Sequence, residues 1–174
     1  AGGTGLIAMQ WARMMDVEIT GTVSSEEKKE LAKNYGAANV INYARENFVE
    51  QIRDITQGRG VDVVFDSVGA STFYQSIQSL KKYGLMVSYG NASGKVSAFD
   101  LGLLSGHLFI TRPTLWSYVA TRKELEVTFG ELLQLVMLNK IRIPIYQKKP
   151  LQDVVTLHKL MEERRTTGCS ILTV

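Results

Sequence analysis

The chain contains 174 residues, of which 45% are hydrophobic and 21% are charged, with 15 glycines, 3 prolines and one cysteine. This composition is typical of a globular protein and excludes a disordered, collagen-like or disulfide-rich chain. The formal net charge is only +3 and the basic residues form no dense cluster, so the sequence predicts no nucleic-acid partner.

Neither membrane insertion nor disulfide formation is expected for this sequence. Its apolar segments are far shorter than the roughly 20 residues that a membrane helix needs, and no signal peptide opens the chain. Cys169 is the only cysteine, so it has no partner for an internal disulfide or a cysteine metal cage. These features predict a cytoplasmic protein without a membrane partner.

The first residues form a glycine-rich turn. The sequence begins at Ala1 without an initiator methionine and continues as Gly2-Gly3-Thr4-Gly5, so we interpret it as a fragment. After this turn, short β-branched runs alternate with segments of helical period, which predicts parallel strands joined by crossover helices. The predicted strands cover residues 17–23, 39–43, 61–66, 85–89 and 107–111.

Three of the predicted helices between these strands place apolar residues at i, i+4 and i+7. The sets are Ile7, Trp11 and Met14; Phe48, Ile52 and Ile55; and Phe73, Ile77 and Leu80. Ser24 and Glu27 form an S-x-x-E capping box for a further helix, which runs to Tyr35 and stops at Gly36.

The pattern of apolar residues changes in the last part of the chain. Thr121 and Glu124 mark the start of a long amphipathic helix over residues 121–139. Isoleucines at positions 141, 143 and 145 alternate with other residues and predict a half-exposed strand. The remaining predicted elements are a helix over residues 151–164 and a strand over residues 170–174.

The fold class follows from the order of these elements. Alternating strands and helices are typical of an α/β fold with a Rossmann-like, doubly wound parallel sheet. The strand that should precede the glycine turn is missing from this chain, and in the strand order 3-2-1-4-5-6 it lies at the centre of the sheet. We predict an NADP-binding Rossmann-like domain over residues 1–139 and a C-terminal strand-helix-strand extension over residues 140–174.

The glycine turn, Gly3-x-Gly5-x-x-Ala8, matches the dinucleotide fingerprint with alanine in its third position. Gly3 permits a tight turn, Gly5 lets the backbone approach a pyrophosphate, and Ala8 lets the helix pack closely on its sheet. The N-terminus of that helix offers free N–H groups to an anion. A purely structural turn is the alternative, but the alternating strands and helices that follow favour a dinucleotide.

The residues after the first predicted strand favour NADP over NAD. An NAD site usually has an acidic residue about 20 residues after the glycine turn, where it binds ribose hydroxyls. Residues 22–25 read Thr-Val-Ser-Ser there, and Glu26 and Glu27 fall inside the capping box. Lys28 lies one turn into the helix, where a cation could meet a ribose phosphate. The alternative is a solvated surface lysine.

Polar residues also follow other predicted strands, at the strand ends where ligands of this fold class bind. Ser67 follows Asp66, and Tyr89 and Gly90 end the next strand. Each could contact a ligand or simply turn the chain. Tyr43 could cover an adenine or close the rim of the core.

Groups for nucleophilic or metal chemistry are absent from the sequence pattern. His107 and His158 have no Cys, Asp or Glu at the spacing of a metal site or a catalytic triad. Asp62 and Asp66 lie on one side of a predicted strand, too far apart to share a proton. The sequence therefore predicts neither a catalytic residue nor a metal ligand in this chain.

Several blocks of the sequence together resemble a known family. They are residues 1–8, 21–23, 40–43, 60–69, 87–94, 111–113 and 164–168. With these blocks, essentially the whole chain resembles the cofactor-binding half of the quinone oxidoreductase branch of the medium-chain dehydrogenase/reductase superfamily.

The resemblance implies an enzyme that passes hydride from NADPH to a quinone without zinc, next to an N-terminal catalytic domain that this chain lacks; the chain alone is expected to be inactive. It also implies a role for each matching position. Gly3, Thr4 and Gly5 would hold the pyrophosphate, and Lys28 would meet the 2′-phosphate beside Tyr43 and Arg164. The groove would be lined by Ser67, Tyr89 and Gly90, and the nicotinamide would be flanked by Phe109, Ile110 and Thr111.

Two departures from the family pattern concern the missing first strand and a short segment at residues 104–107. The family pattern also sends residues 141–147 and 170–174 to the absent catalytic domain, which predicts exposed isoleucines. The predicted edge strand at residues 107–111 has few charges to deter pairing, so we expect a homodimer through this edge, as in relatives.

Two alternatives remain for the function. An enoyl or enone reductase of the same superfamily would share this half of the protein, because it binds the cofactor and carries little information about the acceptor. A non-catalytic dinucleotide-binding protein belongs to a different class and would need no acceptor at all.

Overall fold

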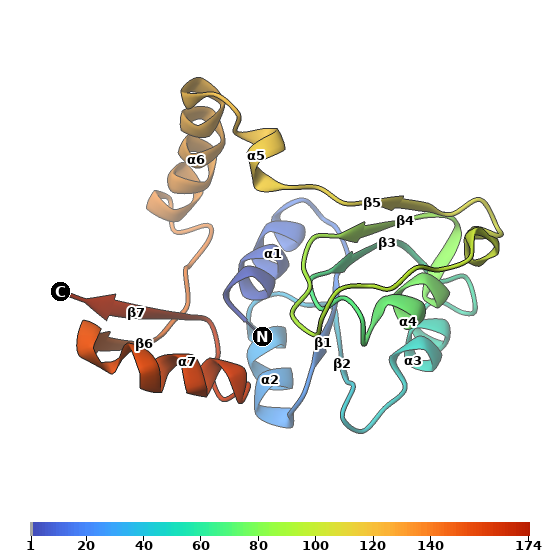
Figure 1. Cartoon of the computed structure of the whole chain (residues 1–174), viewed down its shortest axis with the longest axis horizontal. Helices are drawn as coiled ribbons and strands as arrows, with labels where there is room; N and C mark the ends of the chain where they lie inside the picture. Colours follow the sequence, from blue (N-terminus) through green and yellow to red (C-terminus); the bar gives the residue numbers. More distant parts are fainter. Residues whose placement is uncertain (1) are drawn as a thin grey trace. The chain divides into compact units, whose positions relative to one another are not determined.

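The computed structural model describes residues 2–174 and divides into two compact units. Among the described residues, the first unit consists of residues 2–46 and Phe129–Val174, and the second of Asn47–Thr128. Each contains parallel strands with helices between them (Figure 1). The expected α/β class with parallel sheets is confirmed.

The N-terminal part of the first unit is a helix-strand-helix-strand segment. Its elements are α1 (Gly3–Met14), β1 (Thr20–Val23), α2 (Glu26–Asn34) and β2 (Asn39–Asn42). The two strands pair in parallel from Thr20 opposite Asn39 to Val23 opposite Asn42. Buried apolar residues of all four elements pack together, which fixes both helices against the strands: Leu6, Met9, Val23, Ala32 and Val40 with the adjoining Ala37.

Helix α2 begins one residue later than the predicted capping box requires. Ser25, not Ser24, has the extended backbone of an N-cap, and its Oγ accepts a hydrogen bond from the Lys28 N–H at 3.3 Å. The residue three positions after this cap is therefore a lysine rather than Glu27, so the reciprocal carboxylate bond of a capping box does not form.

Ser25→Ala is expected to lower the free energy of unfolding by about 1 kcal/mol, because an N-cap alanine leaves a helix N–H without its acceptor. Urea unfolding followed by circular dichroism measures this loss. Ser24→Ala is the matched control and should have a smaller effect, since Ser24 makes no cap bond. Equal losses in the two variants would contradict the assignment of Ser25 as the cap.

The C-terminal part of the first unit is a second parallel pair. After α6 (Arg122–Met137), the elements are β6 (Ile145–Pro150), a short 3-10 turn (Leu151–Asp153), α7 (Val154–Glu162) and β7 (Cys169–Thr173). Strands β6 and β7 pair in parallel, as expected for a strand-helix-strand extension. The predicted start of α6 is confirmed, since Glu124 Oε2 accepts from Thr121 N–H and the Thr121 hydroxyl accepts from Glu124 N–H.

The prediction of a strand with exposed isoleucines at residues 141–145 is wrong for its first residue. Ile141 is 1% exposed, and its N–H bonds to the Leu135 carbonyl at 3.2 Å, so it lies buried in the turn that follows α6. Pro144 lacks an N–H, and the strand starts only at Ile145. Ile143 and Ile145 are exposed, as predicted.

The second unit is a three-stranded parallel sheet in the order β3-β4-β5. Its elements are α3 (Phe48–Ile55), β3 (Val61–Asp66), α4 (Phe73–Gln78), β4 (Leu80–Ser88), a 3-10 turn (Leu101–Leu104), β5 (Phe109–Thr111) and α5 (Leu115–Tyr118). Phe73, Ile77 and Met86 form its buried centre. The Phe73 ring lies 4.9 Å from that of Phe99.

The boundaries of β4 and β5 differ from the prediction. Leu80, predicted to end a helix, is the first residue of β4 and pairs with Val61 before an irregularity in the register. His107, predicted to start the last strand, has a left-handed backbone with φ 61° and stacks on Tyr83, whose φ is 63°. The left-handed backbone of His107 does not fit the start of a strand, and β5 begins at Phe109.

Within residues 2–174, β1 pairs only with β2, and β3 pairs only with β4, so each leaves one edge without a ladder.

Candidate functional site

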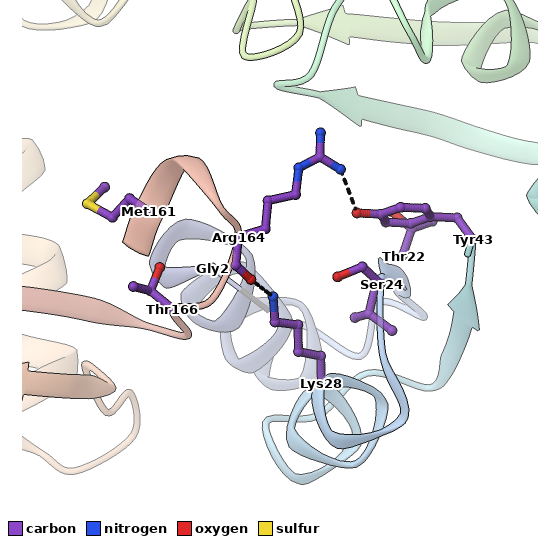
Figure 2. A pocket seen from close by; sticks show the side chains of 9 residues that line it. Gly2, Thr22, Ser24, Lys28, Tyr43, Met161, Arg164 and Thr166 are labelled. Carbon is purple, nitrogen blue, oxygen red and sulfur yellow. Dashed lines mark hydrogen bonds between the residues drawn. The ribbon is translucent and has the colours of Figure 1, made fainter. Parts of the chain in front are cut away.

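A pocket of about 210 Å³ lies in the first unit, beside the carboxyl ends of β1 and β2. Figure 2 shows its residues, which come from the glycine turn, the β1–α2 connection, the end of β2 and the segment around α7. They are Gly2, Thr22, Val23, Ser24, Lys28, Tyr43, Met161, Arg164 and Thr166. A parallel bridge between Gly2 and Gly168 joins the glycine turn to the segment after α7.

Three predicted residues, Lys28, Tyr43 and Arg164, meet in this pocket (Figure 2). The Lys28 ammonium donates to the Arg164 carbonyl at 2.5 Å, and the Arg164 guanidinium donates to the Tyr43 hydroxyl at 3.1 Å. Arg164 has a left-handed backbone with φ 57°, and both its carbonyl and its side chain make contacts in the pocket. Neither cation has a carboxylate partner among the ion pairs of residues 2–174.

The pocket is therefore suited to an anion. A phosphate could take the place of the Arg164 carbonyl on the Lys28 ammonium and accept from the Arg164 guanidinium as well. Thr22, Ser24 and Thr166 are pocket residues that sequence reasoning did not single out. At Thr22 and Ser24 the sequence showed only that an acidic residue is absent. No motif spacing points to Thr166.

The fingerprint residues Gly3, Thr4 and Gly5 form the first turn of α1 rather than a turn before it. This helix start has no side-chain cap and no acidic residue, so it offers backbone N–H groups to an anion. A Cβ on Gly5 would meet nothing within 4 Å, which leaves room for a ligand on that side. A Cβ on Gly3 would lie 2.6 Å from the Cys169 sulfur, so close packing requires glycine there.

Glu26 lies next to this pocket in sequence but does not line it. Its Oε1 accepts from the Asn42 amide at 2.7 Å and lies 3.8 Å from the Arg45 guanidinium. The Asn42 hydrogen bond, followed by the charges of Lys29, Arg45 and Lys33, lowers the pKa of Glu26 below its usual value. The carboxylate is therefore ionised at neutral pH.

The other predicted residues lie in the second unit, at the carboxyl ends of its strands. Ser67 follows β3, Tyr89 and Gly90 follow β4, and Ile110 and Thr111 end β5. The loops after β3 and β4 are in close contact, because a Cβ on Gly90 would overlap the Ser67 carbonyl. Ile110 also lines a pocket of about 280 Å³ within this unit.

Two residues to which the sequence assigned no binding role, Asp66 and Arg112, hold these loops. Asp66 is buried and its carboxylate accepts four hydrogen bonds, from the N–H groups of Val68 and Gly69 and the hydroxyls of Thr72 and Ser76. Arg112 donates to the carbonyls of Ser88 and Gly90 at 3.1 and 3.0 Å. The only feature of the sequence that could have pointed to them is a charged residue at the end of a predicted strand.

Metal ligation and membrane insertion find no support in the described part of the chain. Among residues 2–174, no three His, Cys, Asp or Glu side chains are grouped closely enough to hold a metal ion. No helix of these residues is both long and apolar enough to cross a bilayer.

Parallel strands alternating with helices, a glycine-rich helix start without a side-chain cap, and a basic pocket at the strand ends are typical of a nucleotide-binding protein of the Rossmann class. The chain belongs to the zinc-binding dehydrogenase family, whose sequence model matches residues 3–135. A zinc site does not fit the residues of this chain that the structure describes.

Several individual proteins are similar to this chain. The chain is 44% identical to quinone oxidoreductase 1 of Escherichia coli, with 99% of this chain and 54% of the relative covered. It is 40% identical to a 2-haloacrylate reductase of Burkholderia, with 99% and 53% covered. The crystal structure of Escherichia coli quinone oxidoreductase complexed with NADPH matches with a TM-score of 0.96 at 43% identity, covering 100% of this chain and 55% of that one.

The chain thus spans about half the length of the relatives that it matches. These likenesses confirm the predicted resemblance to the quinone oxidoreductase branch and the Rossmann-like fold class.

Proposed function

We propose that this chain binds NADPH and that the protein acts as a quinone oxidoreductase. The observation that carries the proposal is the meeting of Lys28, Arg164 and Tyr43 in one pocket of the first unit. The 44% identity to a quinone oxidoreductase and the likeness to an NADPH-bound structure support both the cofactor and the reaction.

Each part of the cofactor is assigned to the residues that would bind it, according to where these residues lie in the fold. Gly3, Thr4 and Gly5 would bind the pyrophosphate through the N-terminus of α1, and the Lys28, Tyr43 and Arg164 side chains would bind the 2′-phosphate. In the second unit, the loop residues Ser67, Tyr89 and Gly90 would line the dinucleotide groove. Ile110 and Thr111, at the end of β5, would flank the nicotinamide.

The bound cofactor would supply the hydride, and the residues of this chain would bind and orient it. No residue of the chain is assigned to proton transfer or to a metal. The chain alone is accordingly proposed to be inactive toward a quinone, and residues 1–139 and 140–174 are proposed as the cofactor-binding domain and its extension.

We also propose a homodimer that pairs through β5, and a cytoplasmic location. Strand β5 pairs with β4 on one side, and no ladder among residues 2–174 covers its other edge. Phe109 in this strand is 57% exposed. An uncovered, uncharged strand edge favours pairing with a second copy, which light scattering tests by the mass in solution. The single cysteine supports a reducing location.

The thermal stability of the protein tests cofactor binding directly. NADPH at about 100 times its dissociation constant is expected to add about 2.7 kcal/mol to the free energy of unfolding. NADH at the same concentration should produce a smaller rise in melting temperature, because it lacks the 2′-phosphate. An equal rise with both cofactors, or none with either, would contradict the proposal.

The acceptor distinguishes the proposed reaction from its alternatives. The 40% identity to a 2-haloacrylate reductase supports, as a second candidate, reduction of an activated carbon–carbon double bond. Oxidation of NADPH by the intact protein, measured with a quinone and with an enone in parallel, separates the two. Cofactor binding without turnover of either acceptor would favour a non-catalytic dinucleotide-binding protein.

A further inference from the structure

Glu26 is an acidic residue close in sequence to Lys28, the residue proposed to bind the 2′-phosphate. Glu26 lies three residues beyond the end of β1, close to the strand end at which dinucleotide sites that prefer NAD carry an acidic residue. It is also the first residue of α2, the helix that presents Lys28. A carboxylate in the pocket would bind ribose hydroxyls and repel a 2′-phosphate.

The structure shows why this carboxylate does not reach the pocket. Glu26 Oε1 accepts from the Asn42 Nδ2 at 2.7 Å, and Glu26 is not among the pocket residues. The Arg45 guanidinium, at 3.8 Å, attracts it in the same place. Glu26 is therefore held against the turn after β2, away from the residues that surround Lys28.

The orientation of the Asn42 amide is fixed by its own contacts. Asn42 is 2% exposed, and its Oδ1 accepts from the Ala44 N–H at 3.2 Å. With the carbonyl used in this way, the amide NH₂ must face Glu26. The Asn42 N–H donates to Glu46 Oε1 at 3.3 Å, which ties the residue further into the turn that carries Tyr43.

We propose that Asn42 is a specificity-determining residue: by binding the Glu26 carboxylate, it keeps a negative charge out of the pocket around Lys28 and Arg164 and so permits a 2′-phosphate there. This inference rests on the proposed NADPH function. Asn42 is a positioning residue for Glu26 and touches no cofactor itself. The preference for NADPH thus depends on an acidic residue being sequestered as well as on a lysine being present.

The test is a double-mutant cycle on the intact protein, with the dissociation constants of NADPH and NADH measured by calorimetry. Asn42→Ser retains a hydroxyl that can accept from the Ala44 N–H but is too short to reach Glu26. The preference for NADPH should fall by about threefold to tenfold, because the released charge acts on the phosphate at short range, and the fall should shrink at high salt.

Glu26→Gln alone should change the preference by less than twofold, since its amide oxygen can still accept from Asn42 and the wild-type charge is already turned away. In the double variant, Asn42→Ser with Glu26→Gln, the preference should return to within twofold of wild type. This recovery separates release of a charge from a general disturbance of the Tyr43 turn, which the glutamine would not repair.

Three results would overturn the inference while leaving the proposed function intact. They are an unchanged preference in Asn42→Ser, no recovery in the double variant, or a rise above threefold in Glu26→Gln alone. Melting curves check that each variant folds, and if Asn42→Ser does not, Glu26→Gln alone decides. A wild-type protein that binds no NADPH would overturn the proposed function, and the inference with it.

Discussion

Lys28→Ala is expected to weaken NADPH binding by about 10- to 100-fold and to leave NADH binding within about twofold. Within residues 2–174, the ammonium is bonded only to the Arg164 carbonyl, so it is available to a 2′-phosphate. A hydrogen bond between two charged groups contributes about 1.5–3 kcal/mol, which corresponds to this range in affinity. Calorimetric titration with the two cofactors measures both constants.

The adjacent Lys29 provides the matched control. Lys29→Ala removes the same charge from the same helix, but the Lys29 ammonium lies 3.6 Å from Glu46 and does not line the pocket. Its NADPH affinity should stay within about threefold of wild type, because the half-buried Lys29 ammonium is paired with Glu46 and lies outside the pocket. Similar losses in both variants would show that general charge, rather than a contact at Lys28, governs binding.

Asp66→Ala is expected to lower the free energy of unfolding by about 3 kcal/mol or more. The buried carboxylate accepts two backbone and two hydroxyl hydrogen bonds, and alanine leaves all four donors without this acceptor. The loop that carries Ser67 would lose its fixed conformation as well, so cofactor affinity should fall together with stability. Urea unfolding and NADPH titration measure the two effects.

Asp62 lies in the same strand and serves as the comparison. Its side chain is 62% exposed and pairs with Lys81, whose hydrogen bond and charge lower the pKa of the Asp62 carboxyl. Asp62→Ala should cost less than about 1 kcal/mol, as is usual for a surface ion pair. Asp66→Asn should fall between the two, because the Thr72 and Ser76 hydroxyls can turn to accept from its amide. A loss at Asp62 that equals the loss at Asp66 would refute the role given to the buried network.

Local signals predicted much of the fold. The alternation of strands and helices follows from apolar periodicity, and the start of α6 follows from Thr121 and Glu124, which do bond to each other. The boundaries of the strands were harder to predict, because they depend on pairing with strands that are distant in the sequence. The extension of β4 back to Leu80 requires pairing with Val61, and the left-handed backbone of His107 accompanies its stacking on Tyr83.

The residues of the candidate site could also be predicted only in part. Lys28 was identified by its spacing from the glycine turn, whereas Arg164 entered only through the family resemblance. Neither spacing nor periodicity could predict that Asn42 binds Glu26, because a single side-chain bond between the end of β2 and the start of α2 leaves no repeating pattern. The roles of Asp66 and Arg112 likewise depend on backbone groups that three-dimensional folding brings within reach.

The first unit is discontinuous in sequence, and this has a consequence for its biosynthesis. Its pocket joins Gly2 and Lys28 to Arg164 and Thr166, so contacts across most of the chain length must form before the pocket exists. Residues 47–128 are contiguous and can fold while the ribosome still holds the remainder. Such long-range contacts form slowly, because loop closure precedes any stabilisation. The pocket is therefore expected to be the last part to mature, and a nascent chain stalled before Arg164 should gain no protection from proteolysis by NADPH.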